Sequence, residues 1–279
     1  MEKHWLRSYP EGVPHEVHPQ QYRSLTHLLD ESFRKNAANP FSVCMERWMS
    51  YAQLDEFSVA LGAWLQAQGL EPGARVAIML PNIPQFAVAM AAVLRAGYTC
   101  VNVNPLHTAR ELEHQLKDSG ASAIVILENF ASTLEEVIDH TSVKHVVMAS
   151  MGDLLGFWFG RWITFAVRHL AKMVPAYKLP LGDGRKVTTF KQALAQGSGL
   201  ALKPTPQTLD SIAFLQYTGG TTGLSKGAVL THGNIVAAIL QAEAWFSPAL
   251  KRVGDISKSN SIAALPLYHI FALTLCLLA

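Results

Sequence analysis

Short apolar segments alternate with helical patterns along much of the sequence, and this alternation constrains the fold more than any other feature. Most of these segments are apolar along their whole length, so both faces of each should be buried. Strands buried on both faces are typical of parallel sheets that helices cover on each side. We therefore predict an α/β fold with strands at 75–80, 99–103, 123–127 and 144–148 and helices at 86–95, 108–117 and 131–138.

The remaining segments predict three parts of the chain. Residues 1–24 read as an extended lead-in, 25–210 as a first α/β subdomain, and 211–279 as the incomplete start of a second. Residues 179–207 are rich in Gly, Pro and Lys and predict a surface connection. The other predicted elements are a helix at 25–36 capped by Ser24, two short strands within 42–51, helices at 54–68, 190–195 and 235–246, a strand from 212, a strand at 261–265, and a helix from about 270.

Residues 217–227, YTGGTTGLSKG, gather four glycines, three threonines, one serine and one lysine into a single loop. Glycine lets backbone N–H groups converge on an anion, and hydroxyl and ammonium groups add donors for phosphate oxygens. This composition favours a nucleotide polyphosphate over a plain Gly/Thr hairpin. The loop matches neither the G-x-x-x-x-G-K-[ST] phosphate loop nor the dinucleotide fingerprint G-x-G-x-x-G.

The loop resembles the signature [YF]-T-S-G-T-T-G-x-P-K-G of the adenylate-forming enzymes, the acyl-CoA synthetase and luciferase superfamily. Gly220 stands where most members have serine, and Ser225 where most have proline. The glycine variant is similar to the loop of bacterial long-chain fatty-acid–CoA ligases. Residues 69–82 and 102–112 also resemble segments of this superfamily, and they are mainly structural there.

A second tract, LPLYHIFALT at 265–274, resembles the second core motif of acyl-CoA ligases. In that family an aromatic–histidine pair borders the acyl pocket and the route by which the thiol approaches. The resemblance therefore gives an acyl and coenzyme A pocket role to Tyr268 and His269.

The resemblance implies the N-terminal domain of an adenylate-forming enzyme, truncated, without the C-terminal domain that carries the family's catalytic lysine. In the implied reaction a long-chain fatty acid attacks ATP in the presence of Mg²⁺, and coenzyme A then displaces AMP. We expect this part alone to be inactive and assign it neither a catalytic residue nor a metal ligand. The alternatives are a non-catalytic nucleotide- or acyl-binding remnant and an adenylating enzyme for another carboxylic acid. The residues expected to hold the ATP phosphates are Thr218, Gly219, Gly220, Thr221, Thr222, Gly223, Ser225, Lys226 and Gly227.

Residues 154–174 form an aromatic-rich segment whose basic residues are spaced by seven and four, which predicts one shared helical face. A basic face beside an aromatic one is typical of a helix at a membrane surface, whereas spanning would place three charges inside the bilayer. The alternative is an ordinary helix that packs on the core. The residues expected at a membrane surface are Trp158, Arg161, Trp162, Arg168 and Lys172.

Composition restricts the partners and the compartment. A net charge of only +2 gives no support for nucleic acid as a partner. Three widely spaced cysteines without a C-x-x-C pair favour a reducing compartment, and no apolar leader is present at the start. We expect a cytoplasmic protein with peripheral contact to the inner face of the membrane. The histidines at 15, 18, 107, 114, 140 and 145 are interpreted as surface residues without a metal.

Overall fold

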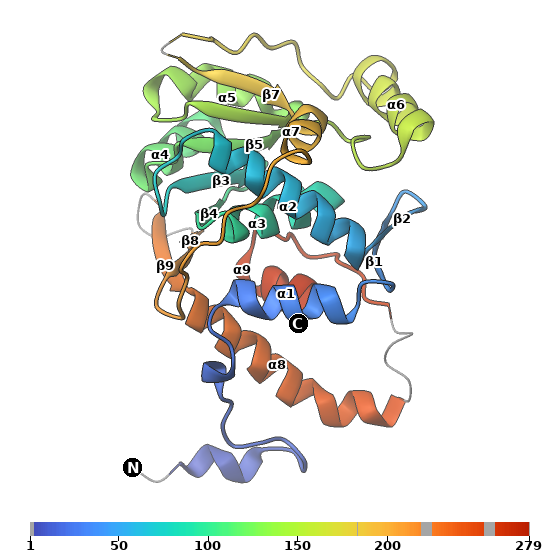
Figure 1. Cartoon of the computed structure of the whole chain (residues 1–279), viewed down its shortest axis with the longest axis vertical. Coiled ribbons are helices and arrows are strands. Elements are labelled where there is room, and N and C mark those ends of the chain that lie inside the picture. The colour runs from blue at the N-terminus through green and yellow to red at the C-terminus, as the bar shows by residue number, and fades with distance from the viewer. Residues whose placement is uncertain (1–2, 183, 219–224, 254–259, 279) are drawn as a thin grey trace.

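The computed structural model describes residues 3–182, 184–218, 225–253 and 260–278, and Figure 1 shows a central sheet between helices. Its seven strands follow the order β7-β6-β5-β3-β4-β8-β9, and every neighbouring pair is parallel except β8 and β9. The predicted α/β fold with a mostly parallel sheet is confirmed. The strands are β3 (Arg75–Met79), β4 (Thr99–Asn102), β5 (Ala123–Leu127), β6 (His145–Ala149), β7 (Lys186–Thr189), β8 (Ile212–Thr218) and β9 (Lys226–Thr231).

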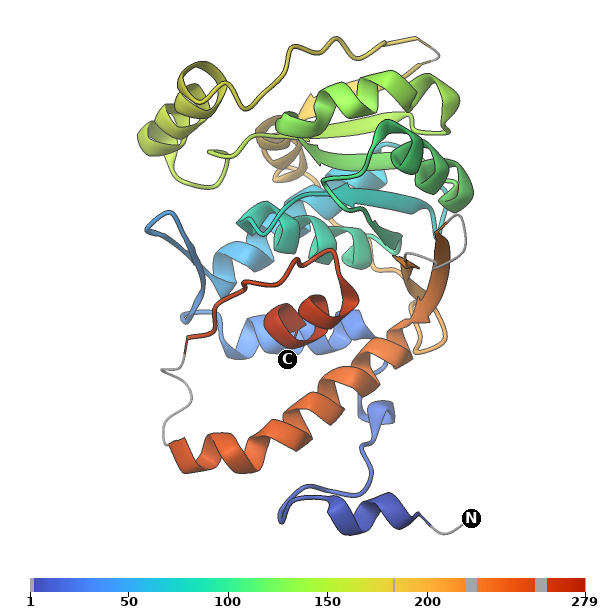
Figure 2. The same ribbon diagram turned by 180° about the vertical axis from the view of Figure 1, so that it is seen from behind.

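Helices cover both faces because alternate residues of a strand point to opposite sides of the sheet. In β3, Val76 and Ile78 belong to one buried core, whereas Ala77 and Met79 belong to the other. The turned view in Figure 2 shows the second layer of helices. The first core is covered by α1 (Leu25–Lys35), α2 (Tyr51–Ala67), α3 (Pro84–Arg95), α7 (Phe190–Gly197) and α8 (His232–Val253), and the second by α4 (Ala109–Ser119) and α5 (Ala131–Val137).

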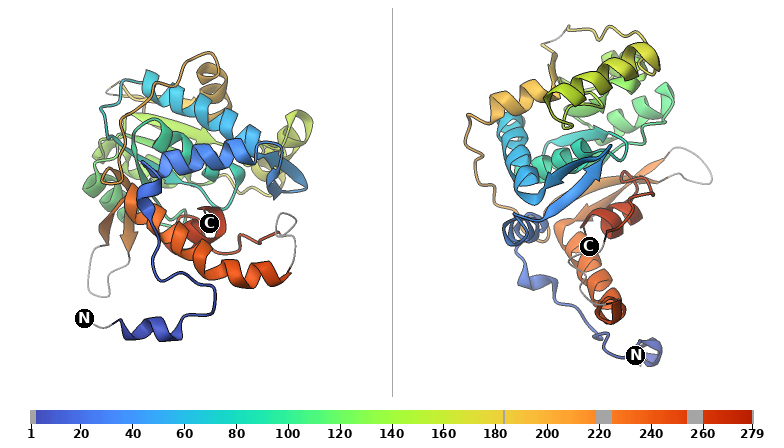
Figure 3. Two further views of the ribbon diagram at one scale, coloured as in Figure 1. Left: turned by 60° about the horizontal axis from the view of Figure 1, so that its bottom comes forward. Right: turned by 90° about the vertical axis from the view of Figure 1, so that its right-hand side faces the viewer.

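The lead-in and the small elements lie around this body. Figure 3 shows the N-terminal segment leaving the body beside α8, where Tyr9 packs edge-on against Trp245 with ring centroids 5.3 Å apart. The lead-in was predicted to be extended, and it contains two short 3-10 turns, His4–Ser8 and Pro19–Gln21. The remaining elements are the hairpin β1 (Pro40–Cys44) and β2 (Arg47–Ser50), α6 (Phe157–Phe165), α9 (Ile270–Ala272), 3-10 turns at Glu128–Phe130 and Ile138–His140, and π-helical turns at Ala166–Leu170 and Leu273–Leu278.

Local sequence signals fix several helix starts. The Ser24 hydroxyl accepts the N–H of His27 at 3.1 Å, as the predicted cap requires. The Thr231 hydroxyl likewise accepts the N–H of Asn234 at 3.2 Å at the start of α8. Helix α2 begins at Tyr51, three residues before the predicted start, because Ser50 and Gln53 form a capping box.

Three predicted segments differ in the structure. Strand β7 was expected to be part of a surface connection; it pairs with β6 at the sheet edge and is largely exposed, so its sequence lacks an apolar pattern. The strand predicted at 261–265 is wrong, because those residues are exposed and irregular. The helix predicted at 154–174 is shorter: the α-helical part ends at Phe165, and Lys172 has a positive φ of 52°.

Strands β8 and β9 join the main sheet through β4, so the sheet continues across the expected boundary at 210. The assignment of 211–279 to a second subdomain stays a prediction. In the portion of the chain that the structure describes, no helix combines the length and the apolar character needed to cross a bilayer.

Candidate functional site

The two ends of the glycine-rich loop are held in register by the β8–β9 hairpin. Thr218 ends β8 opposite Lys226, which begins β9, and the preceding pair is Tyr217 and Gly227. The side chains of Thr218 and Lys226 are exposed. The five loop residues predicted to hold phosphate between them, Gly219, Gly220, Thr221, Thr222 and Gly223, lie outside the described residues.

Helix α4 contacts the base of the loop on both sides, at Tyr217 of β8 and at Ser225 just before β9. The Tyr217 hydroxyl donates to Asp118 Oδ2 at 2.5 Å, and burial together with this acceptor raises the pKa of Tyr217, so the phenol stays protonated. His114 Nε2 lies 2.9 Å from the Ser225 carbonyl oxygen, which can only accept, so Nε2 carries the proton. A Cβ at Gly227 would lie 3.0 Å from the Tyr217 ring, which explains why glycine stands there.

The histidine interpretation from the sequence needs correction here. His114 was interpreted as a surface residue, yet it binds the loop base from a half-buried position. His145 is buried within β6, and burial lowers its pKa. The available signal was the spacing of His114 and Asp118, which are one helical turn apart; the sequence does not show which strand that face meets.

Asn82, which follows β3, binds the backbone at the start of the tract at 265–274 and just before it. Its Nδ2 donates to the carbonyl oxygens of Ala263 at 2.7 Å and Leu265 at 2.8 Å, and its Oδ1 accepts the N–H of Leu267 at 2.8 Å. The bonds to Ala263 and Leu265 satisfy two carbonyl groups that the predicted strand would have paired with a neighbouring strand, and the third holds the backbone just after it. The tract is therefore an irregular segment anchored at the end of β3.

A chain of amide hydrogen bonds joins this tract to the strand that leads into the loop. Gln216 Nε2 donates to the Tyr268 carbonyl at 3.0 Å, and Asn102 Nδ2 donates to Gln216 Oε1 at 3.2 Å. Tyr268 is half-buried against the core, and His269 is exposed at the start of α9. Both segments thus lie at the carboxyl ends of the parallel strands β3, β4 and β8, the edge where open α/β sheets bind ligands.

The segment predicted to meet a membrane has a different geometry from the one expected. Trp158 and Trp162 of α6 are 80% and 55% exposed, as a surface role requires. Arg168 instead reaches into the protein and pairs with Glu128, whose side chain is 1% exposed. Lys172 lies beyond the helix. A single solvated basic face is therefore not formed.

The described ranges hold no close cluster of metal-binding side chains. No group there of three or more His, Cys, Asp or Glu side chains could hold an ion. The described residues therefore do not form a magnesium site by themselves.

The sequence matches known proteins along nearly its whole length. The family model described as AMP-binding enzyme matches residues 29–279. A protein named long-chain-fatty-acid–CoA ligase from Escherichia coli O157:H7 is 47% identical over the whole chain, which covers 48% of that protein. One of the same name from Bacillus subtilis is 30% identical over 98% of the chain and covers 47% of that protein.

The fold also matches a solved structure. A crystal structure of a long-chain-fatty-acid–CoA ligase from Archaeoglobus fulgidus aligns with a TM-score of 0.66 at 20% identity, over 97% of this chain and 47% of the other. The chain thus spans about half the length of the curated relatives it matches. Because the AMP-binding model covers nearly the whole sequence, this chain belongs to the AMP-binding enzyme family, whose members are adenylate-forming enzymes.

Proposed function

We propose that this chain is the phosphate-binding portion of a long-chain fatty-acid–CoA ligase. The observation that carries the proposal is the β8–β9 hairpin, which sets Thr218 and Lys226 opposite each other with their side chains exposed. The anchoring of Tyr217 by Asp118 and of Ser225 by His114 supports it, because a phosphate cradle needs donors that do not have to reorganise when charge develops. The 47% identity to the Escherichia coli relative favours the long-chain substrate class.

In this proposal the loop acts on the departing pyrophosphate. Backbone N–H groups of 219–223, the hydroxyls of Thr218 and Ser225 and the ammonium of Lys226 hold the β- and γ-phosphates while a fatty carboxylate attacks the α-phosphorus. Coenzyme A then displaces AMP from the acyl-adenylate. Tyr268 and His269 border the acyl group and the thiol route, and their link to β8 through Gln216 keeps that border in register with the loop. Magnesium would be bound mainly by phosphate oxygens and water.

The first test joins this chain to the remaining residues of the Escherichia coli relative and measures acyl-AMP formation from palmitate and ATP. Lys226→Ala should lower kcat/KM for ATP by about 100-fold, the usual cost of losing one preorganised charge donor. Lys203→Ala, which removes an exposed lysine outside the hairpin, is the matched control and should leave kcat/KM unchanged. Equal kinetics of the two variants would argue against the loop assignment, and faster turnover of aromatic acids would argue against the long-chain class.

We further propose that the exposed aromatic side of α6 contacts a membrane surface, where fatty acids partition. Replacing Trp158 and Trp162 together with serine should weaken co-sedimentation with anionic phospholipid vesicles by about tenfold, because two indole rings lose their apolar contact. Trp5→Ser removes a ring of similar exposure (56%) and is the control. Vesicle binding that does not change in the double variant would contradict this contact.

A further inference from the structure

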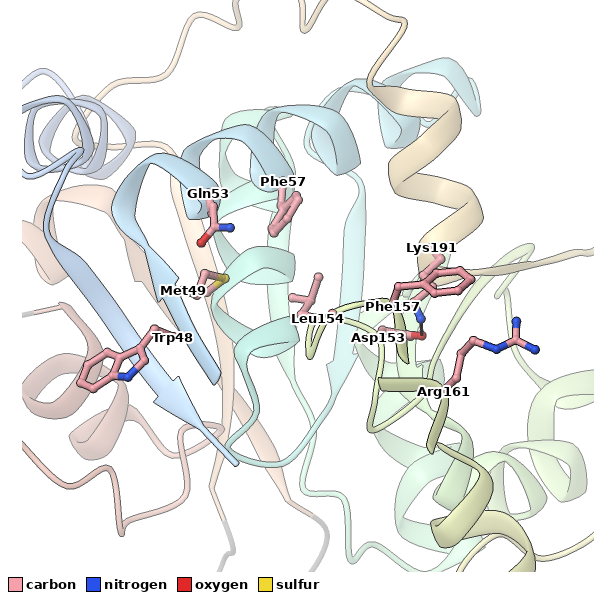
Figure 4. Close-up of a pocket in the computed structure, with 10 residues that line it drawn as sticks. Trp48, Met49, Gln53, Phe57, Asp153, Leu154, Phe157, Arg161 and Lys191 are labelled. Carbon is pink, nitrogen blue, oxygen red and sulfur yellow. Dashed lines mark ion pairs between the residues drawn. The ribbon is translucent and has the colours of Figure 1, made fainter. Parts of the chain in front are cut away.

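A cavity of about 450 Å³ separates β2 and the start of α2 from the segment that enters α6 (Figure 4). Its volume lies in the range of small-molecule sites. None of its lining residues belongs to β8, β9 or the tract after 260. The glycine-rich loop and the tract around Tyr268 therefore do not account for it.

One end of the cavity is apolar. Met49, at 5% exposure, and Phe57 line it from β2 and α2, and Leu154 faces them from the opposite segment (Figure 4). Trp48, which is 61% exposed, stands at the outer edge of this end. Apolar lining that remains in contact with water favours an occupant with a hydrocarbon portion.

The other end of the cavity is charged and carries an excess of positive charge. The Asp153 carboxylate accepts the N–H of Ser150 at 2.7 Å and lies 3.7 Å from Lys191 Nζ, so its charge is already matched. Burial raises the pKa of Asp153 to about 6. The Arg161 guanidinium lies 5.6 Å from the centre of the Phe157 ring, and in the described part of the chain it has no carboxylate partner. An anion at this end would complete the charge balance.

We propose that this cavity binds a free fatty acid, with the chain against Met49 and Phe57 and the carboxylate at Arg161 and Lys191. Arginine favours a carboxylate because its planar fork can donate two parallel hydrogen bonds. The inference goes beyond the proposed adenylation, since the site needs no nucleotide and uses none of the loop residues. It gives the chain a second place for a fatty acid, beside the exposed rings of α6.

The test titrates the whole chain, without ATP, with dodecanoate below its micellar concentration by calorimetry. Arg161→Glu/Lys191→Glu should weaken dodecanoate binding by at least about tenfold, because it replaces charge-assisted bonds with repulsion. Lys178→Glu/Lys203→Glu makes the same charge change at exposed lysines outside the cavity and should leave binding unaltered. Equal losses in the two double variants would overturn the site.

Two further experiments define the chemical class of the ligand and its position in the protein. 1-Dodecanol should bind more weakly than dodecanoate to the wild type, and equal affinity would refute the carboxylate at Arg161. Tighter binding of dodecanoyl lysophosphatidylglycerol than of dodecanoate would overturn the assignment to a free fatty acid. A dodecanoate with a terminal diazirine should label the peptide containing Met49 and Phe57, whereas labelling confined to 210–279 would exclude this cavity. Because adenylation is not measured, these outcomes are independent of the ligase test with Lys226.

Discussion

Arg168→Ala is expected to lower the free energy of unfolding by about 3–5 kcal/mol, the cost of leaving a buried charge without its partner. The Glu128 side chain is 1% exposed, and its Oε2 accepts two hydrogen bonds from the Arg168 guanidinium, the Nε bond at 2.7 Å. Its Oε1 has no partner among the described residues. Alanine would thus leave the Glu128 carboxylate without its cation in a site that is buried in the wild type. Urea denaturation at pH 7.5, followed by circular dichroism, measures the change.

The same pair offers an internal control, because its two members differ in exposure. Glu128→Ala should cost less than Arg168→Ala, since the Arg168 side chain is 45% exposed and can be hydrated once its partner is gone. The double variant should resemble Glu128→Ala alone. Arg161→Ala, an arginine of α6 without an ion pair in the described part, should change stability by less than about 0.5 kcal/mol. An Arg168→Ala effect no larger than that of Arg161→Ala would contradict the buried pair.

The pairing of Arg168 also shows where the spacing of residues in the sequence no longer predicts which face of the structure they share. Spacings of seven and four correctly relate positions on one continuous helix. They do not show that the α-helical part ends at Phe165. They also do not show that Arg168 pairs with the buried carboxylate of Glu128, 40 residues earlier in the sequence. The aromatic residues Trp158 and Trp162, by contrast, are exposed as expected.

The central strands were predictable because both of their faces are buried, so nearly every residue in them is apolar. β5 coincides with the predicted segment, and β3 and β4 each end one residue before it. β7 was not predictable, because an edge strand that is largely exposed needs only backbone partners. Likewise, the largely apolar sequence at 261–265 predicted a strand. Asn82 instead binds two carbonyl oxygens of this segment from more than 180 residues earlier in the sequence.

The sequence motifs name the residues of the candidate site, and these assignments stay predictions; the contacts that hold those residues could not be predicted. The glycine-rich loop motif points to Thr218 and Lys226, and the tract at 265–274 points to Tyr268 and His269. The anchoring contacts join residues far apart in the chain, as between Asp118 and Tyr217, and depend on β8 adding to the sheet beside β4. Local spacing carries no information about such a pairing, so the function of helix α4 at the loop base emerges only from the topology.

The start of α1 depends on a buried neutral histidine, which makes the fold sensitive to acid. His232 is fully buried, and its Nδ1 accepts the N–H of Leu25 at 3.1 Å, so the proton sits on Nε2. Protonating Nδ1 would turn this acceptor into a donor facing another donor. Burial already lowers the pKa of His232 from 6.5 to about 4.

Because of His232, the free energy of unfolding should fall by about 3 kcal/mol as the pH drops from 7 to 4. About two thirds of this fall should occur between pH 7 and pH 5. The sign follows from the direction of the shift: between pH 6.5 and 4 the unfolded chain binds a proton that the folded chain refuses, so acid favours unfolding. His232→Asn keeps an acceptor near the Nδ1 position and removes the titration. Its stability should be lower than that of the wild type at pH 7, and the gap should narrow by about 2 kcal/mol at pH 5. Other titrating groups, Asp153 among them, are common to both proteins and cancel in this difference. Urea denaturation of the pair at pH 7, 6 and 5 measures the gap, and a constant gap would show that His232 is not the acid-sensitive group.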